Sequence, residues 1–472
     1  MKMKKQQGIV YGLDDVPKPF AKALGLGLQH VLTMFGATIA VPLILAPAMG
    51  MNAYQTGVLV AAAMLSAGVA TLLQVNFGTR LPIVQGMSFA FLGPFFAIIA
   101  AVGGRGGDPA TIMTYIAGAM ILGAFVEMFI GFSGIIGGIQ NILTPVVIGP
   151  VIALIGLALF GVGAPMAGQN WFLSGIVIIL VFYFTLVLGR KKPTLSLFSI
   201  LLSVLIAYII AATLTITGVY VQGTPGFVDF SGVAAAELFR LRLVFPWGVP
   251  RFDIGFFLAV LAGYLASIIE SYGDYHAVAV VAKAPELTGK QVSRGIGMEG
   301  IGCFLAGIFG GLANTSYTEN IGLVGLTGVA SRYVVNIGAV VLIFLGVFGK
   351  FGATVATIPT PIIGGLYTTL FGLIAAIGIS TAAKADLSSM RNMMIIGFIL
   401  FMGLSVPEYF KGLAAAGTPF AISGAPLLAD IITTIGQTGM AVAAILGLIL
   451  DNIIPGTPEE RGIPRKKLTT AK

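Results

Sequence analysis

Charged residues are scarce in this chain. Of its 472 residues, only 9% are Asp, Glu, Lys or Arg, whereas 57% are hydrophobic, and the mean hydropathy is +1.00. Soluble domains carry about 25% charged residues, so this composition excludes an ordinary soluble protein. Apolar runs of about 17 to 25 residues, each enough to cross a hydrocarbon core of about 30 Å, recur along nearly the whole length. The sequence therefore predicts an all-α polytopic membrane protein.

Cysteine is almost absent, since Cys303 stands alone. A single cysteine excludes an intrachain disulfide and a cysteine-based metal site. We find no nucleophile–base pair, Walker-type loop or metal-ligand motif, so we expect neither an enzyme nor a cofactor or metal centre. The net charge of +8 is better explained by basic residues on cytoplasmic loops than by nucleic-acid binding.

The hydropathy pattern predicts fourteen membrane spans, of which the third and tenth are too short or too polar to be continuous helices. With the N-terminus inside, nearly every basic cluster falls on the cytoplasmic side, except in the loop 220–253. We therefore expect a multi-pass protein of the plasma membrane, surrounded by lipid, with both termini in the cytoplasm. The predicted spans begin near Phe20, Ala53, Leu81, Thr111, Ile142, Trp171, Leu195, Ile254, Gly295, Tyr317, Arg332, Pro361, Asn392 and Asp430.

An internal repeat supports this layout. The segments Thr144–Gly149 and Thr360–Gly365 match at an offset of 360 − 144 = 216 residues. This match makes span five equivalent to span twelve. Seven spans per repeat is an odd number, so the two repeats must have opposite orientations in the membrane. The sequence thus predicts two inverted 7-span repeats, the plan of many secondary transporters.

The two short spans carry polar, glycine-punctuated sequence, namely Leu81–Pro94 and Asn314–Thr327. In inverted-repeat transporters, the substrate lies near the midplane, where the ends of discontinuous helices offer unpaired backbone groups. We therefore expect the backbone N–H groups near Phe89 and Thr318 to face a planar polar ligand.

Acidic residues and a histidine occupy spans that are otherwise apolar. Glu270 and Asp274 are four residues apart, which places them on one helical face of span eight. His30 lies in span one, and Glu299 is expected to open span nine. Acids and a histidine inside a membrane suit a proton-coupled carrier.

Structural roles are the alternative for several of these residues. His30 would then be a packed, hydrogen-bonded residue, Asp274 would hold span eight against span one, and Glu299 would cap the start of a helix. For Glu127, in span four, the sequence suggests no partner.

The stretch Glu319–Thr327 resembles the signature of the nucleobase/ascorbate transporter family: an acid, amide or proline, then Asn-x-Gly, then Thr five residues after the Gly. The likeness extends to Gly27–Gly36, Ser88–Phe91 and Ile269–Tyr275 and so covers essentially the whole chain. The resemblance implies a homodimer in which a core domain moves like an elevator against a gate domain.

Applied to this chain, the resemblance divides the sequence into seven parts. These are a cytoplasmic segment (1–19), the core domain (20–134 and 254–350), the gate domain (135–219 and 351–455), an extracellular loop (220–253) and a cytoplasmic tail (456–472).

The resemblance also implies roles for single residues. Glu270 matches the substrate-binding acid of span eight, and Glu319 matches a position that is an acid in uracil carriers, usually a glutamine in xanthine and urate carriers, and a proline in ascorbate carriers. The other implied roles are conformational support for Asn320, backbone amides for Phe89 and Thr318, and an aromatic wall for Tyr317. Two residues depart from the common pattern: Gly328 stands where many members have Arg or Lys, and Glu299 stands where some bacterial purine carriers have Asp.

These features predict a secondary active transporter that imports a nucleobase, with uracil as the first candidate, by proton symport. Carboxylates accept hydrogen bonds from the ring N–H groups of uracil, and backbone amides donate to its carbonyls. The first alternative is a xanthine, urate or general purine carrier of the same family, and Na⁺ is the alternative coupling ion. The second is an anion exchanger or channel of the same fold, although no span clearly supplies the basic residues that anion selectivity requires.

Overall fold

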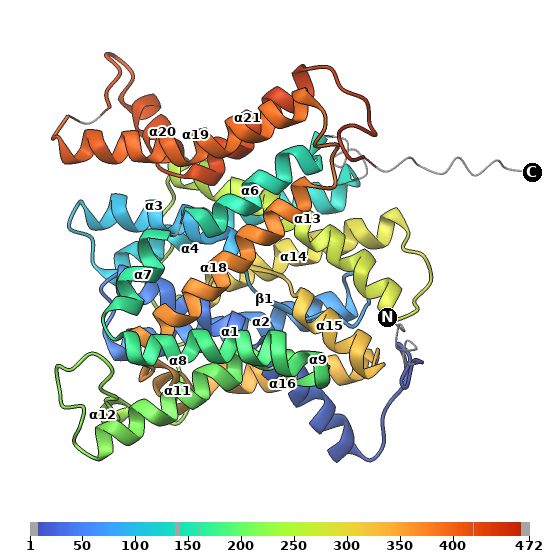
Figure 1. Cartoon of the computed structure of the whole chain (residues 1–472), viewed down its shortest axis with the longest axis vertical. Helices are drawn as coiled ribbons and strands as arrows, with labels where there is room; N and C mark the ends of the chain where they lie inside the picture. The colour runs from blue at the N-terminus through green and yellow to red at the C-terminus, as the bar shows by residue number, and fades with distance from the viewer. Residues whose placement is uncertain (1–7, 137–141, 159, 419, 464–472) are drawn as a thin grey trace, which may run out of the picture.

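The computed structural model describes residues 8–136, 142–158, 160–418 and 420–463, most of which are helical (Figure 1). The longer helices are α1 (Phe20–Ala48), α2 (Ala53–Asn76), α3 (Leu92–Gly103), α4 (Pro109–Ser133), α6 (Pro145–Leu157), α8 (Trp171–Phe182), α11 (Ser199–Ile216), α13 (Ile254–Val281), α14 (Gly289–Phe309), α15 (Thr318–Thr327), α16 (Arg332–Val347), α18 (Thr360–Ala382), α19 (Met390–Ala415), α20 (Pro426–Gly436) and α21 (Gly439–Ile453). The shorter ones are η1 (Phe89–Phe91), α7 (Phe160–Gly168), η2 (Tyr183–Leu188), α9 (Gly189–Lys191), α10 (Pro193–Ser196), α12 (Ser231–Ala235) and α17 (Gly349–Ala356).

Ten helical segments in the described part of the chain are long and apolar enough to cross a membrane, and three further apolar helices are shorter. The protein is therefore a mostly helical, multi-pass membrane protein. A total of fourteen spans and their inverted arrangement remain predictions.

Several helices begin where the sequence predicts a span, and their first turns are capped. Asn52 forms a capping box with Gln55 at the start of α2, and the Asp253 side chain accepts from the Phe256 amide at the start of α13. Helix α14 starts earlier than predicted, because Thr288 caps it. Glu299 therefore lies inside a helix, and its interpretation as a helix cap is wrong.

The prediction of an all-α fold omits one small sheet. Strands β1 (Gln85–Met87) and β2 (Asn314–Ser316) pair antiparallel, with Gln85 opposite Ser316. Each strand lies within one of the two segments predicted to be short and discontinuous, and a helical segment follows each of them, η1 and α3 after β1 and α15 after β2. The pairing satisfies backbone groups that hydrocarbon would leave without partners.

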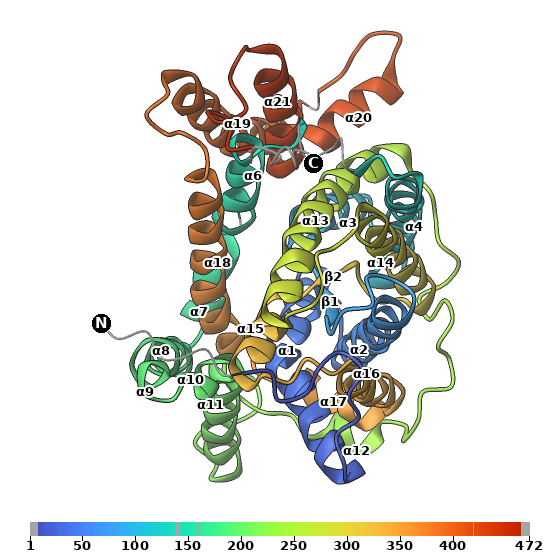
Figure 2. The ribbon, with the colours of Figure 1, turned by 90° about the vertical axis from the view of Figure 1, so that its right-hand side faces the viewer.

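The helices pack in two groups, which Figure 2 shows side by side. In the first group, α4 packs against α14 and α13, while α2 packs against α14, α16 and α17. In the second group, α18 packs against α6, α7 and α8, and α19 packs against α21. The sheet of β1 and β2 belongs to the first group, where it contacts α1, α2, α13 and α14.

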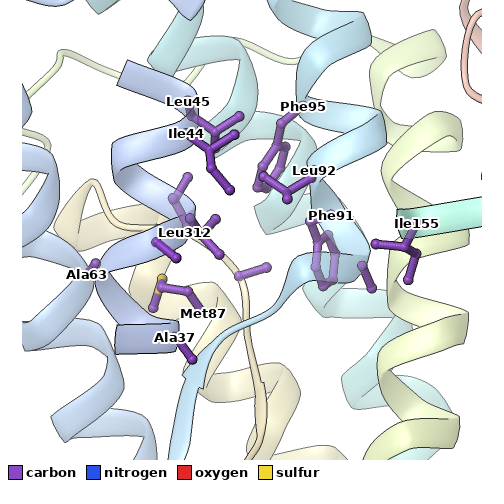
Figure 3. Packing of buried hydrophobic residues seen from close by; sticks show 14 of the residues in the cluster. Ala37, Ile44, Leu45, Ala63, Met87, Phe91, Leu92, Phe95, Ile155 and Leu312 are labelled. Atoms are coloured by element: carbon purple, nitrogen blue, oxygen red, sulfur yellow. The ribbon is translucent and has the colours of Figure 1, made fainter. Parts of the chain in front are cut away.

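Apolar packing fixes the segment that follows β1. Figure 3 shows Ile44 and Leu45 of α1 facing Phe95 of α3, and Phe91 of η1 beside Ile155 of α6. The Phe91 ring meets Tyr264 of α13 edge to face, with the ring centroids 4.8 Å apart. This contact holds the start of α3 against α13.

The two Thr-Pro segments of the predicted repeat start helices that pack on each other. Thr144 is the N-cap of α6, and α18 begins at Thr360. The helices approach closely where Gly149 of α6 faces the backbone of Ala382 on α18. The two matching segments thus both lie at helix starts, which differ by one residue relative to the match.

Residues 9–15, here called the N-terminal strap, lie against the loop that follows α15. The Val10 amide donates to the Gly328 carbonyl at 2.8 Å, the Ala330 amide donates to the Tyr11 carbonyl at 2.8 Å, and the Arg332 amide donates to the Leu13 carbonyl at 3.0 Å. Asp14 forms an ion pair with the Arg332 guanidinium. The strap therefore fixes the C-terminal end of α15.

Candidate functional site

Two acids reach an accessible surface where α13 and α15 meet. The side chain of Glu270 on α13 is exposed, as are Thr318 and Glu319 in the first turn of α15. The carboxyl groups of Glu319 and Asp274 lie within electrostatic range of Glu270. Neither Glu270 nor Glu319 forms an ion pair in the described ranges. The structure therefore brings together the two acids that the sequence assigns to substrate binding.

The N-terminal end of α15 lies beside these acids. Its N-cap is Tyr317, and in the part of the chain that the structure describes no side chain caps this end. The first backbone N–H groups of a helix have no partner within the helix, and the helix dipole makes this end positive. The amides of Thr318 and Glu319 are thus hydrogen-bond donors next to two carboxylate acceptors.

The start of η1, the helical segment that follows β1, is arranged differently. Ser88 caps η1, and its Oγ accepts from the Ala90 amide at 3.2 Å. The Phe89 side chain is half-buried against the main apolar core. Phe89 stands two residues after the end of β1, as Thr318 stands two residues after the end of β2.

Asp274 ties α13 to α15. Its carboxyl group is 7% exposed and accepts from the Thr318 hydroxyl at both oxygens, at 3.0 and 3.1 Å. The sequence suggested instead that Asp274 holds span eight against span one. The observed contact is with the signature helix α15, so that alternative is wrong in its partner.

His30 and Asn320 form the contact between α1 and α15. Both are buried, and the Asn320 side-chain amide donates to the His30 carbonyl at 3.0 Å. The same amide nitrogen lies 3.2 Å from Nδ1 of the His30 ring. His30 is therefore a packed, hydrogen-bonded residue that contacts α15, the helix that carries Glu319.

The Tyr317 side chain points away from the accessible surface. It is 4% exposed, its hydroxyl donates to the Met87 carbonyl at 2.8 Å, and the Thr38 hydroxyl donates to it at 3.3 Å. Its ring covers Gly86, where a Cβ atom would come within 2.5 Å of the ring. In the structure this side chain supports the β1–β2 pairing. Its role as an aromatic wall at the ligand stays a prediction.

Glu299 lies behind the accessible acids, in a pocket of hydroxyl groups. It is 1% exposed and accepts from Ser267 at 3.0 Å, from Ser271 at 2.7 and 2.6 Å, from Tyr275 at 2.9 Å and from Ser316 at 3.4 Å. We call these four residues the hydroxyl cage. Our sequence reasoning missed it, although Ser267, Ser271 and Tyr275 follow one another at the four-residue spacing that marks one helical face.

A small apolar pocket lies between the two groups of helices. Its lining includes Val147 of α6, Ile269 of α13 and Ala444 of α21. Ile269 directly precedes Glu270 in the chain, so the pocket lies beside the turn of α13 that carries the accessible acid.

Comparison with known proteins identifies the family. The model described as "Permease family" matches residues 21–412. The chain belongs to the nucleobase/ascorbate transporter family. The transporter is 35% identical over 511 residues to Solute carrier family 23 member 2 of Mus musculus, covering 99% of this chain and 78% of that protein. It is 36% identical over 482 residues to Nucleobase-ascorbate transporter 2 of Arabidopsis thaliana, covering 98% and 92%. It is a membrane transport protein and not an enzyme.

Solved structures share the fold of this transporter at low sequence identity. The murine anion transporter Slc26a9 in its inward-facing state aligns with a TM-score of 0.61 at 11% identity, covering 93% of this chain and 69% of that one. The transmembrane domain of the cyanobacterial bicarbonate transporter BicA aligns with a TM-score of 0.52 at 15% identity, covering 90% and 99%. These similarities concern the fold alone.

Proposed function

We propose that this transporter imports uracil by proton symport. The observation that supports the proposal is the position of two accessible acids, Glu270 and Glu319, beside the uncapped N-terminal end of α15. The carboxyl groups accept hydrogen bonds and the backbone amides at this helix end donate them. The edge of a pyrimidine ring, which carries both N–H and carbonyl groups, requires both kinds of partner.

The expected contacts follow from the chemistry of the base. Uracil offers ring N–H groups next to carbonyl groups, so each carboxylate accepts from an N–H. The backbone amides of Thr318 and Phe89 donate to the carbonyls. Asn320, Tyr317 and Asp274 act indirectly, because their side chains hold α15 in place through α1, β1 and α13.

The clustering of acids supports coupling to protons. Glu270, Asp274 and Glu319 lie within electrostatic range of one another, and no Lys or Arg of the described ranges forms an ion pair with any of them. An uncompensated charge near the bilayer midplane costs about 2.5 to 3.5 kcal/mol even on insertion scales. A bound proton removes one such charge before the site reorients. In this proposal Glu270 carries the proton, and the buried His30 assists Glu270 in this role.

The two packing groups of helices support an elevator-like movement. In the proposal, the core domain (20–134 and 254–350) carries the site, and the gate domain (135–219 and 351–455) stays in place. The proposed unit is a homodimer in the plasma membrane with cytoplasmic termini, and the small apolar pocket between α6, α13 and α21 marks part of the surface along which the domains slide.

Uptake into proteoliposomes tests this function. With radiolabelled uracil, an acidic exterior at zero membrane potential should stimulate entry, and a protonophore should abolish the stimulation. Uptake that ignores pH but follows a Na⁺ gradient would overturn proton coupling and leave the substrate in place. Replacing Na⁺ with K⁺ in the same preparation separates the two ions.

Competition in the same assay tests the substrate. Unlabelled uracil should inhibit more strongly than xanthine, urate or adenine. Stronger inhibition by xanthine or urate would favour the purine carrier, which the chain's departures from the family pattern at Gly328 and Glu299 keep as a second candidate. Ascorbate, an anion near neutral pH, should not compete, because two carboxylates line the site; competition by ascorbate alone would overturn the nucleobase proposal.

A further inference from the structure

Glu127 is a buried acid that the proposed substrate site does not use. It lies on α4 with 0% exposure, and neither of its carboxyl oxygens has a hydrogen-bond partner among the described residues. An ionised carboxylate in such a place would lose its hydration without compensation. The surroundings of Glu127 therefore suit a carboxyl group that holds a proton.

The neighbours of Glu127 come from α14 and α13. Helix α4 packs against α14, whose Glu299 and Cys303 face the Glu127 carboxyl group. On α13, Tyr264 and Tyr275 lie within electrostatic range of it. Helix α3, which also packs against α4, has no titratable residue between Leu92 and Gly103. Glu299 is therefore the only other acid that faces Glu127 from these elements.

The two carboxyl groups have opposite surroundings. Glu299 accepts hydrogen bonds from the hydroxyl cage, whose short contacts from Ser271 and Tyr275 suit a negative charge. Among the described residues, no hydroxyl group donates to Glu127, and only the Cys303 thiol lies beside its carboxyl group. Ionising both of two neighbouring carboxyl groups in a low-dielectric interior is costly, so the pair has a strong tendency to bind one proton.

We propose that Glu127 and Glu299 form an internal proton-binding pair, which takes up one proton with the substrate and releases it after transport. The proton binds to a carboxylate oxygen of the pair, so that the pair carries one negative charge instead of two. This inference rests on the proposed proton coupling and adds to it a site separate from Glu270.

The hydroxyl cage connects the pair to the accessible acids. Ser316 of β2 donates its hydroxyl to Glu299, and its amide donates to Ser271 Oγ at 3.2 Å. Ser271 directly follows Glu270, and Ser316 precedes Thr318 by two residues. A change of charge at Glu299 therefore alters hydrogen bonds that position both sides of the substrate site.

A second contact links the pair to β2. The Cys303 thiol, beside Glu127, exchanges hydrogen bonds with the backbone of Asn314, both at 3.3 Å. Asn314 is the first residue of β2. Glu299 thus contacts β2 through Ser316. Glu127 lies beside Cys303, which contacts β2 through Asn314.

Infrared difference spectroscopy of the purified, substrate-free protein tests the pair. Wild type should show a protonated-carboxyl band that titrates with pH and shifts in D₂O, and Glu127→Gln should lose that band. Glu286→Gln, at an exposed loop position, should keep it. A Glu127→Gln variant with the full wild-type titration would overturn the pair.

Transport measurements give a second readout. Glu127→Gln mimics the protonated acid in shape, so it should bind uracil while its uptake loses the stimulation by an acidic exterior. If Glu127→Gln does not fold, Glu299→Gln provides the test, because removing that charge should abolish the same titration. Loss of the infrared band together with unchanged acid stimulation would overturn the coupling role. Because the infrared titration needs no substrate, failure of uracil transport would count against the proposed function and not against the pair.

Discussion

Thr318 on α15 donates one hydroxyl to both carboxyl oxygens of Asp274 on α13, at 3.0 and 3.1 Å. The acceptor is 7% exposed, while Thr318 itself lies at the accessible surface. The backbone amide of Thr318 is predicted to bind the ligand. The Thr318 side chain thus anchors this residue to α13, the helix that carries Glu270.

Thr318→Val should weaken this anchor while keeping the backbone amide. A buried carboxyl group that loses its donor costs about 1 to 3 kcal/mol, so we expect a lower unfolding temperature and weaker uracil binding. Thermal unfolding in detergent and a binding titration measure the two effects. The matched control is Thr318→Ser, which keeps the hydroxyl and should resemble wild type. Equal behaviour of the Val and Ser variants would show that the contact is unimportant.

Glu270→Gln should reduce uracil affinity without unfolding the protein. The amide has fewer acceptor positions for a ring N–H and cannot release a proton. Losing a charge-assisted hydrogen bond costs about 1.5 to 3 kcal/mol, or roughly ten- to hundredfold in affinity. Equilibrium binding checks this, with size-exclusion chromatography as the control for folding. Wild-type affinity in the variant would remove Glu270 from the site.

Glu319→Gln should change the preference between bases. A glutamine can donate to a purine carbonyl and accept from a ring N–H, whereas a carboxylate only accepts. We expect weaker uracil inhibition and relatively stronger xanthine inhibition in competition assays. An unchanged ratio of the two affinities would show that residue 319 does not select the base.

Gly328→Ala should destabilise the end of α15. Gly328 has φ of +68°, and a Cβ atom there would lie 2.6 Å from the Gly8 carbonyl oxygen. The left-handed conformation alone costs a non-glycine residue about 1 to 2 kcal/mol, and the contact would push the N-terminal strap away. Faster hydrogen exchange in residues 9–15 should report this displacement. Gly397→Ala in α19, where nothing lies within 4 Å, should leave the strap unchanged.

Local sequence predicted those features that depend on local properties. The starts of α1, α2 and α13 follow from apolar runs, and the shared face of Glu270 and Asp274 follows from their four-residue spacing. The sequence also marked both interrupted spans, through their glycines and polar residues.

Features that depend on contacts between distant segments could not be predicted in this way. Gln85 pairs with Ser316 across 231 residues, and no periodicity encodes such a partner. The inward direction of Tyr317 follows from that pairing, because the ring covers Gly86. The meeting of Glu127 with Glu299 depends likewise on how α4 packs against α14.

The β1–β2 pairing has a consequence for biosynthesis. Strand β1 belongs to the first half of the sequence and β2 to the second, and they are joined only when the chain has been made past residue 316. Until then, β1 is a polar segment whose backbone has no strand partner, and α2 and α4 lack α14, against which both pack, until residue 309 has been made. Unpaired backbone groups are not tolerated in lipid. The first half must therefore be held in a more hydrated or assisted environment during insertion until β2, the strand that leads into α15, has been made.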